Sequence, residues 1–152
     1  MKKLLVVLLA LGSLSAFSNT CPKLQGIYTG CTSDYDTTVS GITVMQNTVN
    51  GVEVYSYGEA DKNELAYPVS YLMTADKIER DLSELVAPEP DIQSATHKSY
   101  CENGKLVNHM YFLFSDRTGL TALTTYNINK NGDLVIKSTT LQTVETTTCK
   151  RI

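Results

Sequence analysis

The sequence predicts an all-β domain whose antiparallel strands follow one another as a meander and close into a barrel of about eight to ten strands. Asn-Gly pairs occur at Asn50-Gly51, Asn103-Gly104 and Asn131-Gly132, each between two strand-like runs. Asn and Gly reach positive φ at low cost, as both central positions of a type I′ hairpin turn require. The chain also contains nine Tyr and many Thr residues, which favour strands. Three such turns indicate hairpins in succession.

Strand-like runs fill most of the chain after residue 23. In order they are Leu24–Cys31, Ile42–Val49, Val52–Gly58, Glu64–Met73, Gln93–Glu102, Lys105–Ser115, Leu120–Lys130, Asp133–Val144 and Val144–Arg151. Pro68 cannot donate to a ladder, so we expect the fourth run to be an edge or bulged strand. We find no internal repeat and no linker, which predicts one domain.

Residues 75–90 fit two descriptions. Asp76 with Glu79 resembles a capping box, and the downstream prolines would stop a helix. The apolar residues with helical spacing are Ile78, Leu82 and Leu85. The other description is a turn at Thr74–Lys77 followed by a short strand through Leu82. The neighbouring meander favours the turn and strand, and one short helix near 76–86 is the alternative.

Residues 1–18 have the layout of a cleaved signal peptide, which leaves 19–152 as the domain. Lys2 and Lys3 form a basic start, and Leu4–Leu11 is an apolar run too short to span a bilayer. Small residues, Ala16 and Ser18, occupy the −3 and −1 positions of a cleavage site after Ser18. We therefore expect an extracytoplasmic protein, periplasmic or secreted, without a stable membrane anchor.

The four cysteines, Cys21, Cys31, Cys101 and Cys149, all lie beyond the predicted signal peptide. Their wide spacings lack a Cys-x-x-Cys pair, so they predict structural disulfides rather than a redox or metal site. Three pairings are open. In a closed meander with an even number of strands, the start of the first strand lies beside the end of the last, which favours Cys21–Cys149 with Cys31–Cys101. An odd number would instead bring Cys31 towards Cys149.

Charge and motifs argue against several functions. The net charge is −3 with no basic cluster, which is unfavourable for binding nucleic acid. His97 and His109 fall on opposite faces of their hairpin, so they cannot easily share a metal. Asn127–Asp133 follows the spacing of an EF-hand loop, but Ser138 at its twelfth position cannot ligate calcium bidentately, and a hairpin turn is the better interpretation. We predict no catalytic residues, no metal and no cofactor.

Hairpin register predicts the core. Across Asn103-Gly104, Cys101 opposes Leu106 and shares its face with the most apolar set in the chain, which includes Met110, Phe112 and Phe114. The opposite face, with His109 and Tyr111, is also partly apolar. Strands with two apolar faces need cover on both, as a curled sheet or barrel with a loop or partner outside would supply.

Five tyrosines are candidate ligand-binding residues, because a tyrosine offers an apolar ring and a hydrogen-bonding hydroxyl to a cavity. They are Tyr28, Tyr55, Tyr57, Tyr100 and Tyr126. Packing within the β-sheet is the alternative and the favoured interpretation, given tyrosine's preference for strands.

Leu24-Gln25-Gly26-Ile27-Tyr28 resembles the Gly-x-Trp opening of lipocalin-like barrels, with Tyr in the Trp position. The resemblance implies that a basic residue on a late strand, Lys150 or Arg151, packs against Tyr28. Ser115-Asp116-Arg117 is loosely similar to the middle motif of the family. The chain also looks similar to small exported bacterial barrels of unassigned function. The lipocalin-like resemblance implies an eight- to ten-stranded barrel that can hold a small apolar ligand.

The sequence thus predicts a non-enzymatic extracytoplasmic β-barrel that binds a small apolar molecule or a component of the cell envelope. The alternative is a secreted protein-binding module, either an inhibitor or an envelope scaffold. That alternative rests on the two-sided apolar strands and on the proline-flanked loop at 83–92. The oligomeric state is left open.

Overall fold

A computed structural model describes residues 20–34, 39–61, 69–86 and 89–152. The predicted signal peptide at 1–18 and Pro68 lie outside the described residues. The elements are β1 (Gly26–Ser33), β2 (Val39–Val49), β3 (Val52–Asp61), β4 (Val69–Thr74), β5 (Arg80–Asp81), α1 (Ser83–Val86), β6 (Ile92–Glu102), β7 (Lys105–Phe114), β8 (Gly119–Ile128), β9 (Leu134–Thr139) and β10 (Val144–Arg151).

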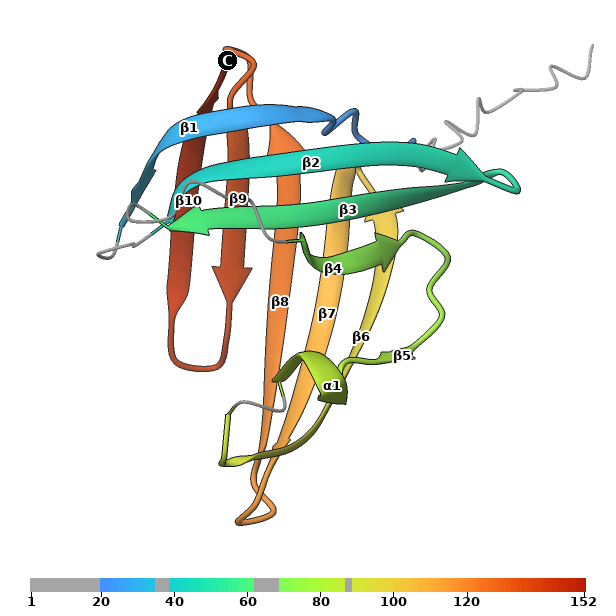
Figure 1. The fold of residues 1–152 in the computed structure, drawn as a ribbon, viewed down its shortest axis with the longest axis vertical. Helices are drawn as coiled ribbons and strands as arrows, with labels where there is room; N and C mark the ends of the chain where they lie inside the picture. Colours follow the sequence, from blue (N-terminus) through green and yellow to red (C-terminus); the bar gives the residue numbers. More distant parts are fainter. Residues whose placement is uncertain (1–19, 35–38, 62–68, 87–88) are drawn as a thin grey trace, which may run out of the picture.

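All ten strands belong to one antiparallel sheet in the order β4-β3-β2-β1-β10-β9-β8-β7-β6-β5. The first and last strands pair, with Tyr28 opposite Arg151, so β1 and β10 lie inside the sheet and its edges are β4 and β5. The predicted all-β meander is confirmed, and it curls strongly into a half-barrel. Figure 1 shows β2 and β3 crossing in front of the upper parts of β7–β9, while the lower parts of β6–β8 extend beyond them.

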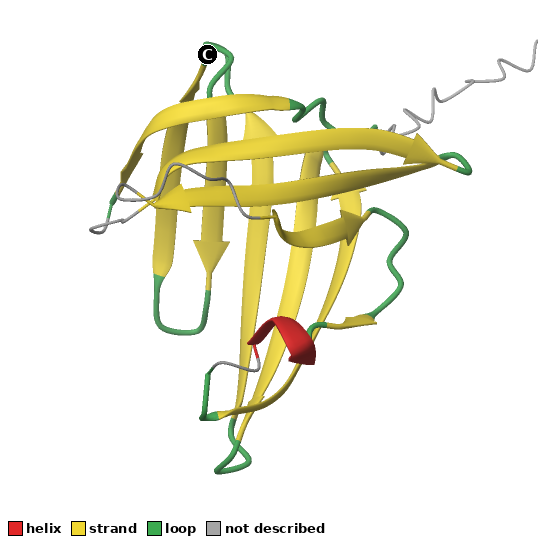
Figure 2. Ribbon diagram, viewed as in Figure 1, coloured by secondary structure: helices red, strands yellow, loops and turns green. Residues whose placement is uncertain are grey.

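Residues 75–86, which follow β4, contain both structures expected for residues 75–90. A bend at Ala75 and Asp76 leads into β5, where Arg80 pairs with His97 of β6. The single helical turn α1 follows, as Figure 2 shows. Asp76 caps no helix; its carboxylate accepts a hydrogen bond from the Ile78 amide and pairs with Arg80 at 2.6 Å. None of the helices in the described residues is long and apolar enough to cross a bilayer.

Two of the three Asn-Gly turns have the expected backbone. Asn50-Gly51 and Asn103-Gly104 have positive φ at both residues, and Cys101 opposes Leu106 as the register predicted. The third turn differs. Only its glycine, Gly132, has positive φ, and the Asn129 side chain accepts the amide protons of both Asn131 and Asp133. Because this side chain organises a longer loop, β8 ends at Ile128 and β9 begins at Leu134.

The core lies where β1–β4 cross the upper half of β6–β10. Its largest fully buried side chains include Tyr28, Tyr55, Leu24, Ile42 and Met73. From the predicted apolar face of the second hairpin, Cys101 and Leu106 are buried in this core. Met110, Phe112 and Phe114 share that face but are only half-buried. They lie on the lower part of the sheet, which β1–β4 do not cover.

The disulfides join Cys21 to Cys101 and Cys31 to Cys149, so the favoured pairing was wrong. The described sheet has an even number of strands, as that pairing assumed. However, Cys21 lies before the start of β1 and therefore outside the ladder that pairs β1 with β10. The register shifts between Thr29 and Thr32, and Gly30 has a φ of 57°. This bulge brings Cys31 beside Cys149.

Candidate functional site

A row of polar side chains crosses the concave face of the half-barrel. Ser99, Asn108, Thr124, Ser138 and Glu145 are successive register partners on β6, β7, β8, β9 and β10. Because register partners point to the same side of a sheet, all five face the interior. We call this set the polar row. It separates the upper core from the half-buried apolar residues of the lower sheet.

Hydrogen bonds within the row satisfy its buried groups. The Asn108 Oδ1 atom accepts a hydrogen bond from Ser99 Oγ at 2.9 Å and lies 3.2 Å from His97 Nδ1. Thr124 and Ser138 share a hydrogen bond of 3.3 Å. Burial lowers the pKa of His97, the Asn108 hydrogen bond raises it, and the charge of Arg80 lowers it further. In the described residues, no buried side-chain nitrogen or oxygen lacks a partner.

A pocket of about 180 Å³ lies at the β9–β10 end of the polar row. Its lining residues are Val39 and Ile42 of β2, Tyr57 and Glu59 of β3, Ile136 and Ser138 of β9, and Glu145 and Thr147 of β10. We call it the concave pocket. Its walls come from β2 and β3 on one side and from β9 and β10 on the other, so the curl of the sheet creates the pocket.

Two carboxylates, Glu59 and Glu145, face this pocket from opposite halves of the sheet. The Tyr57 hydroxyl donates a hydrogen bond of 2.7 Å to Glu59 Oε1, and the Ser33 hydroxyl donates one of 2.7 Å to Glu145 Oε1. A carboxylate has two oxygens and about four lone pairs, so each can accept further donors from a ligand. Apolar walls with two anionic acceptors suit a small molecule that carries a positive charge.

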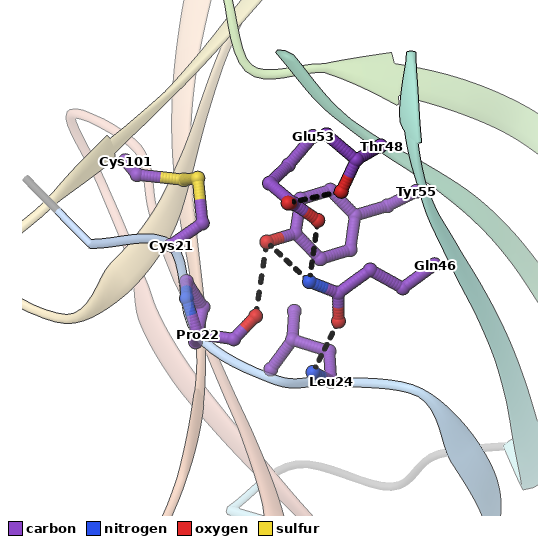
Figure 3. Close-up of a disulfide and its surroundings, with 8 residues drawn as sticks. All are labelled: Cys21, Pro22, Leu24, Gln46, Thr48, Glu53, Tyr55 and Cys101. Carbon is purple, nitrogen blue, oxygen red and sulfur yellow. Dashed lines mark hydrogen bonds between the residues drawn. A yellow bond between two sulfur atoms is a disulfide. The ribbon is translucent and has the colours of Figure 1, made fainter. Parts of the chain in front are cut away.

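The opposite end of the half-barrel is covered by residues 20–25, which we call the strap (Figure 3). The Tyr55 hydroxyl donates to the carbonyl oxygen of Pro22 at 2.9 Å, and the Leu24 amide donates to Gln46 Oε1 at 2.9 Å. Cys21 ties the strap to Cys101 of β6. The strap therefore fills one end of the half-barrel with the buried Leu24 side chain.

Two surface hollows of about 420 and 750 Å³ flank the strap, and Lys23, Gln46 and Glu53 line both. The Glu53 carboxylate accepts hydrogen bonds from Thr48 at 2.6 Å and from Gln46 at 2.8 Å. These bonds lower the pKa of Glu53. Gln46 donates a hydrogen bond to Glu53 and accepts one from the Leu24 amide of the strap. We therefore assign these contacts a structural role.

The structure does not bring the five candidate tyrosines to one cavity. Tyr28, Tyr55, Tyr57 and Tyr126 are buried in the core, and the Tyr57 and Tyr126 rings meet edge to face at 5.6 Å. Tyr28 donates its hydroxyl proton to the Leu24 carbonyl at 2.7 Å. Of the five, Tyr57 lines the concave pocket and Tyr100 lines the smaller hollow beside the strap. Packing in the sheet accounts for most of them.

The two carboxylates of the concave pocket were missed by the sequence analysis. Alternation along the strands could have found them. Tyr55, Tyr57 and Glu59 share one face of β3, and Glu145 shares a face of β10 with the buried Cys149. The signal in the sequence is a charged residue at a position that alternation assigns to the apolar face of a strand. In the part of the chain that the structure describes, no cluster of three or more His, Cys, Asp or Glu residues could hold a metal.

No protein-family model matches this chain, and no curated protein matches its sequence. The fold is similar to a solved structure, that of secretory abundant heat soluble protein 4 from Ramazzottius varieornatus. The TM-score is 0.53 at 11% sequence identity, with 84% of this chain and 94% of that chain covered. At this identity the similarity shows the fold alone, an all-β half-barrel.

The resemblance to lipocalin-like barrels is not confirmed by these comparisons. Of the features it implied, Arg151 lies opposite Tyr28 in the β1–β10 ladder. Its guanidinium group donates to the Gln25 carbonyl at 3.0 Å. Ser115-Asp116-Arg117 forms the tight turn between β7 and β8, closed by the Asp116 carboxylate, which accepts the Thr118 amide proton.

Proposed function

We propose that this protein is a non-enzymatic extracytoplasmic binding protein whose concave pocket holds a small molecule with an apolar body and a positively charged group. One observation carries the proposal. Glu59 and Glu145 reach the same pocket from opposite halves of the sheet, and its other walls include Val39, Ile42 and Ile136. This refines the expected apolar ligand to a small organic cation.

The size of the pocket limits the ligand. A volume of about 180 Å³ is below the range of about 300–1,000 Å³ that is usual for drug-sized ligands. A short-chain primary amine, protonated at neutral pH, suits this volume and chemistry. Its ammonium group has three donors and no acceptor, which complements two carboxylates that accept only.

Binding energy would come from two sources. Burying the alkyl chain against Ile42 and Ile136 contributes about 25 cal/mol for each Å² of apolar surface removed from water. A hydrogen bond between ammonium and carboxylate is worth about 1.5–3 kcal/mol. The Tyr57 and Ser33 hydroxyls hold one oxygen of each carboxylate, which fixes the direction of the remaining acceptor sites.

The proposed extracytoplasmic location is supported by a separate observation. Two disulfides form between cysteines far apart in the sequence, as is usual for proteins of oxidising compartments. The non-enzymatic part of the proposal is the expectation drawn from the sequence, which contains no catalytic motif. His97 lies on β6, at the opposite end of the polar row from the two carboxylates.

The test is a calorimetric titration with three six-carbon probes of matched shape: hexylammonium, hexan-1-ol and hexanoate. We expect hexylammonium to bind best, and its affinity to fall with added salt because charge contributes. Glu59→Gln and Glu145→Gln should each weaken hexylammonium binding about tenfold, since a 1.4 kcal/mol loss is tenfold. Glu102→Gln, at the exposed β6–β7 turn, is the matched control.

Three results would contradict the proposal. The first is equal binding of all three probes, and the second is tighter binding of hexanoate. The third is unchanged hexylammonium affinity in the Glu59→Gln, Glu145→Gln double variant. The alternative expectation, a secreted protein-binding module, stays a prediction.

A further inference from the structure

The outer face of β1–β4 carries no charged side chain at its described positions. Register pairs place the outward residues side by side: Ile27 opposes Thr43, Met45 opposes Ser56, and Ser56 opposes Leu72. The remaining outward positions on these strands include Asn47, Val49, Val52, Val54 and Thr74. We call these ten residues the outer face. By contrast, Glu53 and Glu59 of β3 point inward.

Large apolar side chains on the outer face are exposed. Relative exposure is 49% for Ile27, 51% for Met45, 54% for Val49 and 56% for Leu72. Figure 1 shows β2 and β3 at the front of the molecule, with none of the described helices or strands lying over them. Exposed apolar residues grouped on one face, rather than scattered singly, mark an interaction surface.

We propose that a second copy of this chain docks on the outer face, so that two half-barrels pack back to back about a twofold axis. Charge is the first argument. Two copies carry the same net charge of −3, so an interface between them is favoured where it brings no like charges together. An interface through the outer face brings no like charges together. A twofold interface also requires a patch that complements itself, which an uncharged face satisfies electrostatically.

The second argument is the arrangement of large and small side chains on the outer face. In the row across β2, β3 and β4, the large Met45 and Leu72 flank the small Ser56. Along β2, Met45 and Val49 alternate with the polar Thr43 and Asn47. Rows of large side chains separated by small ones let two sheets interdigitate when they pack face to face. In such packing the mean strand directions of the two sheets differ by about −30°. The same pattern on both copies supplies ridge and groove to each.

The area predicts a reversible dimer. Four strands about 4.8 Å apart, with about seven residues of about 3.3 Å each, present about 400 Å² in projection per copy. Standard interfaces bury about 800 Å² per partner, so this face offers about half that area and falls in the range of weak, transient interfaces. We therefore expect association in the micromolar range or weaker, rather than an obligate dimer.

Sedimentation velocity of the disulfide-bonded chain, from micromolar to sub-millimolar concentration, tests the proposal. We expect the sedimentation coefficient to rise from the monomer to the dimer value. Met45→Glu should raise the dissociation constant at least tenfold, and so should Leu72→Glu. Leu141→Glu, at a 90% exposed residue in the β9–β10 turn, should leave it unchanged. An equal mixture of Met45→Glu and Met45→Lys proteins should associate more tightly than either alone.

A second readout uses the unmodified chain. The Met45 methyl resonance should shift with concentration, whereas resonances of the β9–β10 turn should not. The proposal is overturned if the chain stays monomeric at every concentration, or if Leu141→Glu disrupts the dimer as strongly as Met45→Glu. It is also overturned if a monomeric chain instead floats with phosphatidylcholine vesicles, since a lipid surface would then occupy the face.

Discussion

Tyr55 donates its hydroxyl proton to the carbonyl oxygen of Pro22 at 2.9 Å, and so joins the middle of β3 to the strap. The tyrosine ring is fully buried, and burial raises its pKa, with the nearby Glu53 charge acting in the same direction. Tyr55 is therefore a neutral donor over the physiological pH range. One buried hydroxyl helps hold the segment that covers this end of the half-barrel.

Tyr55→Phe should destabilise the protein by about 1–3 kcal/mol, because the ring still packs while the Pro22 carbonyl loses its donor. Urea unfolding with both disulfides intact measures this. Tyr111→Phe is the control, because Tyr111 is 45% exposed on the outside of β7 and should change stability by less than about 0.5 kcal/mol. Equal effects of the two substitutions would refute the role of this hydroxyl.

The disulfide pairing can be read directly by mass spectrometry of a non-reduced digest. We expect peptides that link Cys21 to Cys101 and Cys31 to Cys149. Replacing both Cys21 and Cys101 with Ser should cost about 2–4 kcal/mol and should speed hydrogen exchange at the Leu24 amide. The matched Cys31→Ser, Cys149→Ser pair should leave Leu24 exchange closer to that of the parent. A peptide that links Cys21 to Cys149 would contradict the structure.

Acidification should destabilise the protein through His97. Its folded pKa lies below the ordinary value of about 6.5, chiefly because burial disfavours the charged ring. The unfolded state then binds the proton first as pH falls. The contribution of His97 to stability is therefore complete above about pH 6.5 and falls towards lower pH by at most about 1.4 kcal/mol per pH unit.

The measurement is the free energy of unfolding between about pH 7.5 and about pH 5 for the parent and for His97→Gln. The parent should lose more stability than the variant over this range, since the variant has no proton to take up at this position. Parallel curves would show that His97 titrates alike in the folded and unfolded states.

Two glycines should respond differently to alanine. A Cβ at Gly26 would lie 3.1 Å from the Tyr28 hydroxyl oxygen and 3.2 Å from Arg151 Nε. Because Tyr28 is fully buried and hydrogen-bonded to Leu24, Gly26→Ala should cost about 1–3 kcal/mol. A Cβ at Gly119 would meet the Tyr111 hydroxyl at 2.6 Å, but this exposed ring can swing away. Gly119→Ala should cost less, and thermal unfolding of both variants decides the order.

The fold was largely predictable because local signals agreed. Asn50-Gly51 and Asn103-Gly104 adopt the predicted turns, and the hairpin register placed Cys101 opposite Leu106 correctly. The disulfide pairing was not predictable, because it depends on where the strap runs and on the bulge at Gly30. Neither feature leaves a periodic pattern in the sequence.

The candidate site was less predictable than the fold. Tyrosines were chosen for their chemistry, yet Tyr28 and Tyr55 donate to backbone carbonyls and fill the core. Glu59 and Glu145 come from strands far apart in the sequence, and only the curl of the sheet brings them to one pocket. Alternation can assign each residue to a face, but the sheet's curvature decides which faces meet.

The most direct test of the concave pocket is an NMR measurement of contacts between bound hexylammonium and the protein. We expect intermolecular nuclear Overhauser effects from the alkyl chain to the methyl groups of Ile42 and Ile136, and none to Ile27 on the outer face. These contacts should disappear in the Glu59→Gln, Glu145→Gln double variant. Contacts confined to Lys23 and Gln46 beside the strap, or the same contacts in the double variant, would contradict this expectation.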